Sequence, residues 1–124
     1  MKQKISFSKQ LKSFHFAFNG LRILFREEHN SWIHLFLTFF AIVFGFLLKI
    51  SVLEWVLLIF SIGFVFVSEI FNSAIENICD LISLENNPLI GKIKDLSAAA
   101  VLFSAITAFI IGTVIFLPKI VVLF

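Results

Sequence analysis

The chain has 124 residues, of which 60 % are hydrophobic and 15 % charged, and its formal net charge is only +2. With a mean hydropathy of +1.04, this composition excludes an ordinary soluble domain and predicts an integral membrane protein. The one cysteine, Cys79, excludes a disulfide within the chain.

The first segment, residues 5–27, predicts an amphipathic helix. Apolar residues recur at alternating spacings of three and four and form one helical stripe: Phe7, Leu11, Phe14, Phe18, Leu21 and Phe25. The opposite face is polar and mainly basic: Lys12, His15, Asn19, Arg22 and Arg26. Such a helix suits a membrane surface, with its cations toward lipid phosphates. The pattern alone leaves open whether these cations only anchor the chain or also hold a nucleotide.

Three apolar segments follow and predict transmembrane helices at residues 32–48, 53–78 and 97–117. The expected fold is therefore an all-α membrane protein, a single domain over residues 1–124 with a surface helix and three spans. We expect breaks at Lys49-Ile50-Ser51, in a polar connector over residues 81–96, and at Pro118, which should end the third span.

The basic residues are distributed unevenly between the two sides of this topology. Three crossings place eight of the ten Lys and Arg side chains with the N-terminal helix and the 81–96 connector, and only Lys49 and Lys119 on the other side. Cytoplasmic segments carry the excess of Lys and Arg. The first side is therefore expected to be cytoplasmic.

The end of the second span carries a stripe of polar side chains. Glu69, Asn72, Glu76 and Asp80 follow one another at helical spacings and point within an arc of about 80°. Glu76 lies near the headgroup level, and Glu69 lies seven residues deeper, roughly 10 Å. Ionisable residues at this depth are costly and by default mark a functional site.

Clustered carboxylates on a membrane face predict a divalent cation between them. Magnesium prefers oxygen ligands and usually takes one or two carboxylates together with substrate phosphates. We therefore expect a metal-bound nucleotide at the wet end of the stripe and a lipid hydroxyl at the buried end. Lys94 would neutralise a transferring phosphoryl group, and a carboxylate free of metal would accept the hydroxyl proton. Gly91-Lys92 lacks the preceding glycine of a P-loop.

Two alternatives belong to other functional classes. In a small ion-coupled transporter, Glu69 would be the proton or substrate site, but the ionisable residues gather at one face rather than at both. A non-catalytic membrane scaffold leaves a buried Glu69 unexplained. A lipid-alcohol kinase accounts for the whole stripe.

Two separated motifs carry a family resemblance. Glu69-x-x-Asn72-Ser73-Ala74-Ile75-Glu76-x-x-x-Asp80, followed by Gly91-x-x-Lys94-Asp95-x-x-Ala98-Ala99-Ala100-Val101, resembles the bacterial integral membrane diacylglycerol kinase and undecaprenol kinase family. The resemblance covers essentially the whole chain. Arg26-Glu27-Glu28-His29-Asn30, Ile33-His34-Leu35 and Glu54-Trp55 are similar to the Gram-positive-type undecaprenol kinases, which favours undecaprenol over diacylglycerol as the acceptor.

The resemblance implies specific roles for individual residues. Glu69 would be the catalytic base, joined in catalysis by Asn72, Lys94 and Asp95. Glu28 and Glu76 would bind Mg²⁺, and Lys9 with Glu69 would contact the lipid. ATP would be bound by Lys12, Phe16, Asn19, Arg22, Glu28, Glu76, Glu85, Asn87, Lys94 and Asp95.

The resemblance also implies the partners and the location of the protein. It implies a homotrimer with active sites shared between subunits, in the bacterial inner membrane with the site on the cytoplasmic face. The expected partners are ATP, a membrane lipid alcohol and the bilayer, with no nucleic acid.

Overall fold

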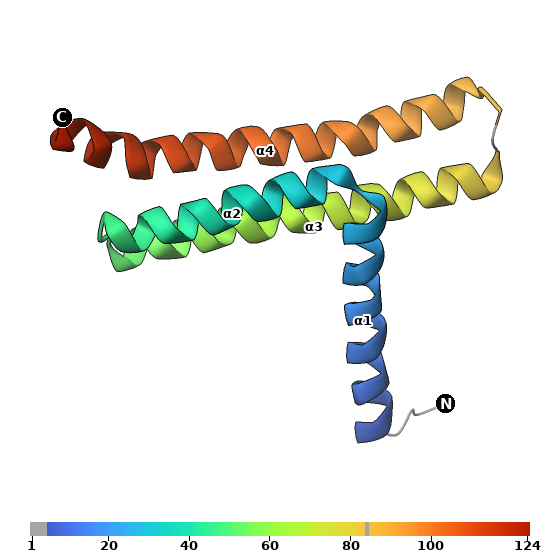
Figure 1. Ribbon diagram of the computed structural model, residues 1–124. Coiled ribbons are helices and arrows are strands. Elements are labelled where there is room, and N and C mark those ends of the chain that lie inside the picture. Colours follow the sequence, from blue (N-terminus) through green and yellow to red (C-terminus); the bar gives the residue numbers. More distant parts are fainter. Residues whose placement is uncertain (1–4, 84) are drawn as a thin grey trace.

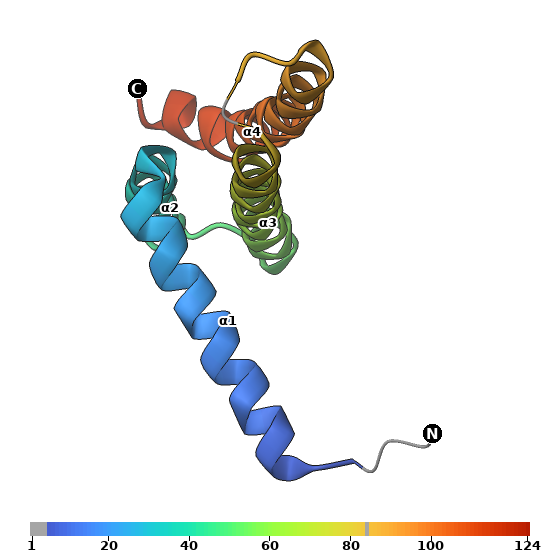
Figure 2. The ribbon, with the colours of Figure 1, turned by 90° about the vertical axis from the view of Figure 1, so that its right-hand side faces the viewer.

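The computed structural model describes residues 5–83 and 85–124, and these form four helices and no strand. The helices are α1 (Phe7–Glu27), α2 (His29–Leu47), α3 (Val52–Ile82) and α4 (Pro88–Leu123). Helices α2, α3 and α4 run side by side, whereas α1 stands across them (Figures 1 and 2). α2, α3 and α4 are long and apolar enough to cross a membrane. The expected fold class of a multi-pass all-α membrane protein is therefore confirmed.

The corner between α1 and α2 is fixed by hydrogen bonds between the two helices. The Ser31 hydroxyl is fully buried and donates to the carbonyl oxygens of Leu24 and Glu28. The Trp32 indole Nε1–H donates to the carbonyl of Phe25 at 2.6 Å. Leu24 is also buried, so the end of α1 is anchored in the bundle while the rest of the helix extends away from it (Figure 2).

A short turn joins α2 to α3, as the sequence predicts. Lys49 takes a left-handed conformation with φ of 52°, which ends α2. Ser51 then caps α3 in a capping box. The Ser51 hydroxyl accepts from the Glu54 N–H, and the Glu54 carboxylate accepts from the Ser51 N–H. The other Glu54 oxygen accepts from Lys119 Nζ at 2.9 Å, so the start of α3 is tied to the end of α4.

Helix α3 packs mainly against the antiparallel helix α4 (Figure 1). Small residues are buried on both helices, including Ser61 and Ser73 on α3 and Ser97 and Ser104 on α4. Small side chains at an interface allow membrane helices to approach closely. This contact sets the register that aligns the polar end of α3 with the start of α4.

Two predicted helix ends around the third span are wrong. The helix that carries this span begins at Pro88, inside the predicted connector over residues 81–96, since Asn87 caps α4 and Pro88 occupies its first turn. Pro is well placed there because it lacks the N–H that the first turn leaves unbonded. At the other end, α4 continues through Pro118 to Leu123. Pro118 removes one hydrogen bond within the helix but does not terminate it.

Candidate active site

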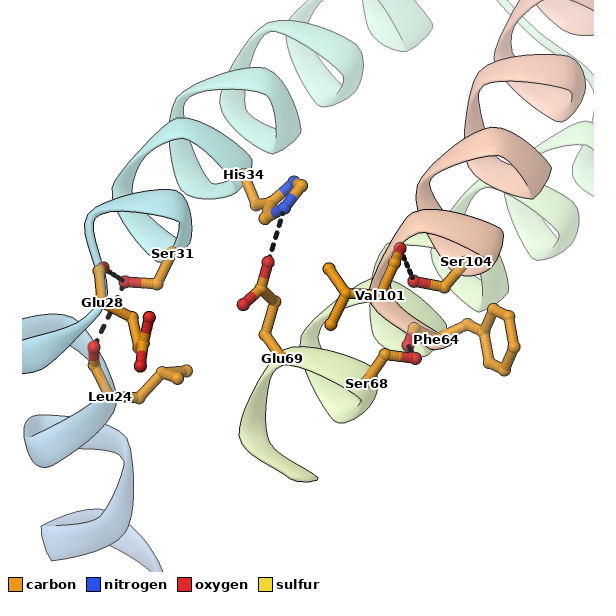
Figure 3. A network of polar contacts seen from close by, with 9 residues as sticks. All are labelled: Leu24, Glu28, Ser31, His34, Phe64, Ser68, Glu69, Val101 and Ser104. Atoms are coloured by element: carbon orange, nitrogen blue, oxygen red, sulfur yellow. Dashed lines mark hydrogen bonds and ion pairs between the residues drawn. The ribbon is translucent and has the colours of Figure 1, made fainter. Parts of the chain in front are cut away.

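Glu28 occupies the single non-helical residue between α1 and α2. Its backbone is extended, with φ of −110° and ψ of 109°, and the hydrogen bonds of Ser31 and Trp32 hold the corner on which it lies. Figure 3 shows its carboxylate on the side that faces Glu69 of α3. Partial burial raises the pKa of Glu28, and the negative charges of Glu76 and then Glu69 raise it further. The three carboxylates therefore share one electrostatic environment.

Glu69 is the most enclosed of these acids, with only 1 % of its surface exposed. Its Oε1 lies 3.0 Å from Nε2 of His34 on α2 (Figure 3). Its Oε2 is buried and has no hydrogen-bond partner among the described residues. A buried polar atom without a partner is uncommon and calls for an explanation, such as a catalytic role or a ligand.

The other polar residues of the α3 stripe contact the start of α4. Asn72 Oδ1 accepts a 2.6 Å hydrogen bond from the Ser97 hydroxyl. Asp80 accepts from Lys94 Nζ at 2.7 Å, with both side chains partly exposed. The antiparallel packing of α3 and α4 thus brings the two sequence motifs together along one edge.

The connector forms a polar hollow beside the Asp80–Lys94 pair. This hollow has a volume of about 390 Å³ and is lined by both of these residues together with Glu85, Asn87 and Gly91. The Asn87 side chain accepts from the Leu89 N–H and so caps α4. Two residues predicted to bind nucleotide, Glu85 and Asn87, therefore lie next to Lys94. Asp95 is exposed on the first turns of α4.

The predicted site residues of α1 are exposed: Lys9, Lys12, Phe16, Asn19 and Arg22. The helix that carries them extends away from α2, α3 and α4 (Figure 2). Among the described residues, none of their side chains makes a hydrogen bond or ion pair.

An apolar cavity begins beside the Glu69 partner His34. Its volume is about 460 Å³, and it runs between α2, α3 and α4 past Thr38, Val65 and Phe66 as far as Ile120. Its lining is almost wholly hydrophobic, with His34, Thr38 and Ser61 as its polar members. A cavity of this kind accommodates an apolar chain with a polar group at the His34 end.

A magnesium site at these carboxylates would need ligands beyond the described side chains. Within residues 5–83 and 85–124, no three His, Cys, Asp or Glu side chains gather closely enough to hold a metal ion alone. Magnesium needs only one or two carboxylates when phosphates complete its coordination. A cation between Glu28 and Glu76 would also offset the repulsion that raises the pKa of Glu28.

His34 is a site residue that the sequence motifs do not mark, although the sequence carries a signal for it. His34 lies six residues beyond Glu28, and Glu69 lies seven residues before Glu76. At 1.5 Å per helical residue, both lie about 10 Å further from the same membrane face. Equal depth on the neighbouring helices α2 and α3 places the two side chains together.

Comparison with known proteins identifies the family. The model of a family described as prokaryotic diacylglycerol kinase matches residues 15–116. The undecaprenol kinase of Bacillus subtilis (strain 168) is 39 % identical over 108 residues, which cover 87 % of this chain and 88 % of that protein. The diacylglycerol kinase of Escherichia coli (strain K12) is 35 % identical over 104 residues, 84 % of this chain and 85 % of that protein. The diacylglycerol kinase of Helicobacter pylori (strain ATCC 700392 / 26695) is 34 % identical over 100 residues, 81 % and 78 % of the two chains.

The family resemblance of the two motifs is thus confirmed by matches over most of the chain. Two residues that carry it, Asp80 on α3 and Lys94 on α4, form an ion pair in the structure, and Asn72 of the first motif accepts from Ser97, which lies within the second. The chain belongs to the prokaryotic diacylglycerol kinase family, a family of lipid kinases.

Proposed function

We propose that this protein transfers the γ-phosphate of ATP to the hydroxyl of a membrane lipid alcohol, with undecaprenol favoured and diacylglycerol second. The curated relatives named above are an undecaprenol kinase and diacylglycerol kinases, and the undecaprenol kinase shares the higher identity. The observation that carries the proposal is the position of Glu69. Its carboxylate is buried and has one oxygen without a partner among the described residues. Its bonded partner, His34, lies at the head of an apolar cavity.

In this proposal Glu69 is the catalytic base. A lipid whose chain occupies the apolar cavity would present its hydroxyl beside His34, the residue that is bonded to Glu69. A positioned carboxylate that accepts the hydroxyl proton accelerates such a transfer by about 10² to 10⁴. Lys9 is the second residue that we assign to the lipid.

Asn72, Lys94 and Asp95 complete the phosphoryl site. The Asn72 carbonyl oxygen accepts from Ser97, which leaves its amide N–H groups free to donate to a phosphate oxygen. Lys94 is held at the same edge of α3 and α4 by Asp80 and supplies positive charge to the transferring group. Asp95 is assigned to the nucleotide.

Glu28 and Glu76 are the residues that would hold the magnesium ion. Once bound, the ion would link these carboxylates to the phosphates of ATP and neutralise charge that develops during transfer. The remaining nucleotide contacts are assigned to residues of α1 and of the connector: Lys12, Phe16, Asn19, Arg22, Glu85 and Asn87.

A homotrimer with shared sites is part of the proposal. The α1 residues assigned to the lipid and the nucleotide are exposed, and α1 extends away from the other three helices of the same chain (Figure 2). A neighbouring subunit could supply the missing half of each site. Most residues of the three spans are not buried within the single chain, so surface remains for such contacts. The positive-inside tendency supports an active site on the cytoplasmic face of the inner membrane.

The experiment is a side-by-side kinetic comparison of two lipids. Purified protein in mixed micelles is given Mg²⁺ and γ-labelled ATP with either undecaprenol or diacylglycerol at equal mole fraction. We expect labelled phosphate in both lipids and a higher kcat/KM for undecaprenol. A higher kcat/KM for diacylglycerol would reverse the acceptor assignment. Transfer to neither lipid, together with proton-coupled uptake into proteoliposomes without ATP, would instead favour an ion-coupled transporter.

A further inference from the structure

His34 is the one described side chain that forms a hydrogen bond with Glu69. Its Nε2 lies 3.0 Å from Glu69 Oε1, and the exposed fractions of the two side chains are 19 % and 1 % (Figure 3). The other ion pairs of the described residues join Lys94 to Asp80 and Lys119 to Glu54, so neither lysine is bonded to Glu69. A carboxylate removed from water is costly unless it is hydrogen-bonded. His34 therefore supplies the bond that Glu69 needs.

The ring of His34 is held in place by contacts on α3. It meets the Phe66 ring edge to face, with centroids 6.4 Å apart and an interplanar angle of 73°. Phe66 lies one turn before Glu69 on the same helix, so the ring is packed and bonded by neighbouring residues of α3. The two neutral tautomers of the ring therefore differ in their contact with Glu69, because only the Nε2–H tautomer can donate to the carboxylate.

We propose that His34 is a positioning residue for Glu69: its Nε2–H donates to Oε1, and this bond orients the free Oε2 toward the lipid hydroxyl. The inference rests on the proposed function, in which Glu69 is the base. The inference extends that function by giving the two oxygens of the Glu69 carboxylate different roles. Oε1 is bonded to His34, and Oε2 is left to react.

The chemical step balances without any change in the charge of His34. The lipid O–H bond breaks and its proton passes to Oε2 of Glu69. The lipid oxygen forms a bond to the γ-phosphorus, while the bond from that phosphorus to the β-γ bridging oxygen breaks. The electron pair of the broken bond leaves with ADP. His34 keeps its Nε2–H throughout and donates to Oε1 before and after the transfer.

Two substitutions at His34 distinguish the effect of its N–H donor from the effect of the volume of its ring. His34→Leu removes the donor, and we expect kcat to fall roughly 10- to 100-fold, the usual cost of losing a hydrogen-bond partner that orients a ligand group in an active site. The KM for ATP should stay within about twofold, because the nucleotide is bound elsewhere. His34→Gln retains an N–H donor and should recover most of kcat.

Ser68→Ala is the matched control, since Ser68 directly precedes Glu69 on α3 and its hydroxyl donates to the Phe64 carbonyl of its own helix rather than to Glu69 (Figure 3). Its kcat should equal that of the wild type. A wild-type kcat in His34→Leu would overturn the proposal. So would a His34→Gln variant as slow as His34→Leu, because packing of the ring rather than its N–H would then matter.

A spectroscopic measurement tests the contact without using activity. Protein labelled with ¹⁵N-histidine, with exposed His15 and His29 changed to Gln, should show His34 locked as the Nε2–H tautomer by NMR. Glu69→Leu should release this preference. If the tautomer is locked but Glu69→Gln retains full kinase activity, the base assignment fails while the contact stands. If His34 shows the Nδ1–H tautomer in the wild type, the positioning role itself is wrong.

Discussion

The Ser97 hydroxyl on α4 donates a 2.6 Å hydrogen bond to Oδ1 of Asn72 on α3. The two residues are 25 positions apart in the sequence, and the antiparallel packing of the two helices brings them together. Ser97 is buried, so water has little access to the bond. The bond fixes the direction in which the amide N–H groups of Asn72 point. The packing of α3 against α4 therefore orients a side chain of the proposed phosphoryl site.

Ser97→Ala tests the importance of this orientation. We expect kcat to fall about fivefold, since one neutral hydrogen bond contributes about 1 kcal/mol, while the lipid dependence of the reaction stays unchanged. Ser104→Ala is the matched control, because Ser104 is also buried on α4 but donates to the Val101 carbonyl of its own helix. Steady-state phosphate transfer measures both variants. Equal rates for Ser97→Ala and the wild type would show that Asn72 needs no support.

Glu76→Gln tests the metal assignment. We expect the Mg²⁺ concentration for half-maximal activity to rise at least tenfold, because a carboxylate ligand is replaced by a neutral amide. Glu28→Gln should do the same. Asp80→Asn serves as the comparison for the Mg²⁺ dependence, since Asp80 pairs with Lys94 and is not assigned to the metal. A normal Mg²⁺ dependence in both Glu28→Gln and Glu76→Gln would contradict the two-carboxylate site.

The raised pKa of Glu28 predicts a pH dependence of magnesium binding. Burial and the charges of Glu76 and Glu69 raise this pKa above the ordinary value of 4.5, so protons compete for the ionised form at a higher pH than at an isolated glutamate. The apparent Mg²⁺ affinity should therefore fall with decreasing pH before ordinary carboxylates titrate. In Glu76→Gln, the loss of one negative charge lowers the pKa of Glu28 and should move this decline to lower pH. Calorimetric titration with a non-hydrolysable ATP analogue at several pH values measures the effect, and an unchanged affinity down to pH 4.5 is the opposing result.

The Glu54–Lys119 pair predicts an effect on stability alone. Lys119→Met removes a partly exposed ion pair and should lower the free energy of unfolding only slightly, because solvent screens such pairs. Glu54→Ala removes the same ion pair and also one half of the capping box of α3, so it should lower the free energy of unfolding more. Neither change should alter kcat. Unfolding in SDS–detergent mixtures measures the two costs, and a larger loss in Lys119→Met than in Glu54→Ala would contradict the role of the cap.

Hydropathy and helical spacing were sufficient to predict the spans and the acidic stripe. The backbone polar groups of the three apolar segments can all be hydrogen-bonded in a bilayer if each segment is a helix. The spacing of Glu69, Asn72 and Glu76 places them on one face of that helix, however the helix packs. The predicted surface helix at residues 5–27 and the predicted first span at residues 32–48 also leave a gap that contains Glu28. These features depend on the local sequence, which is why they could be predicted.

The contacts between helices could not be predicted in the same way. His34 was one polar residue in an apolar run, and its bond to Glu69 depends on how α2 packs against α3. Pro118 predicted a helix end, but α4 continues through it. The free energy lost with one backbone hydrogen bond is smaller than the free energy gained by keeping the rest of the apolar segment helical. The polar residues after Pro88 predicted a loop. They are helical because Asn87 and Pro88 start the helix and no breaker follows.

The most direct test of the central claim is phosphate transfer by Glu69→Gln. We predict that purified Glu69→Gln, compared with wild type in mixed micelles containing undecaprenol, binds ATP normally but transfers its γ-phosphate about 10² to 10⁴ times more slowly. Transfer by Glu69→Gln at the wild-type rate would contradict the claim that this buried carboxylate activates the lipid hydroxyl.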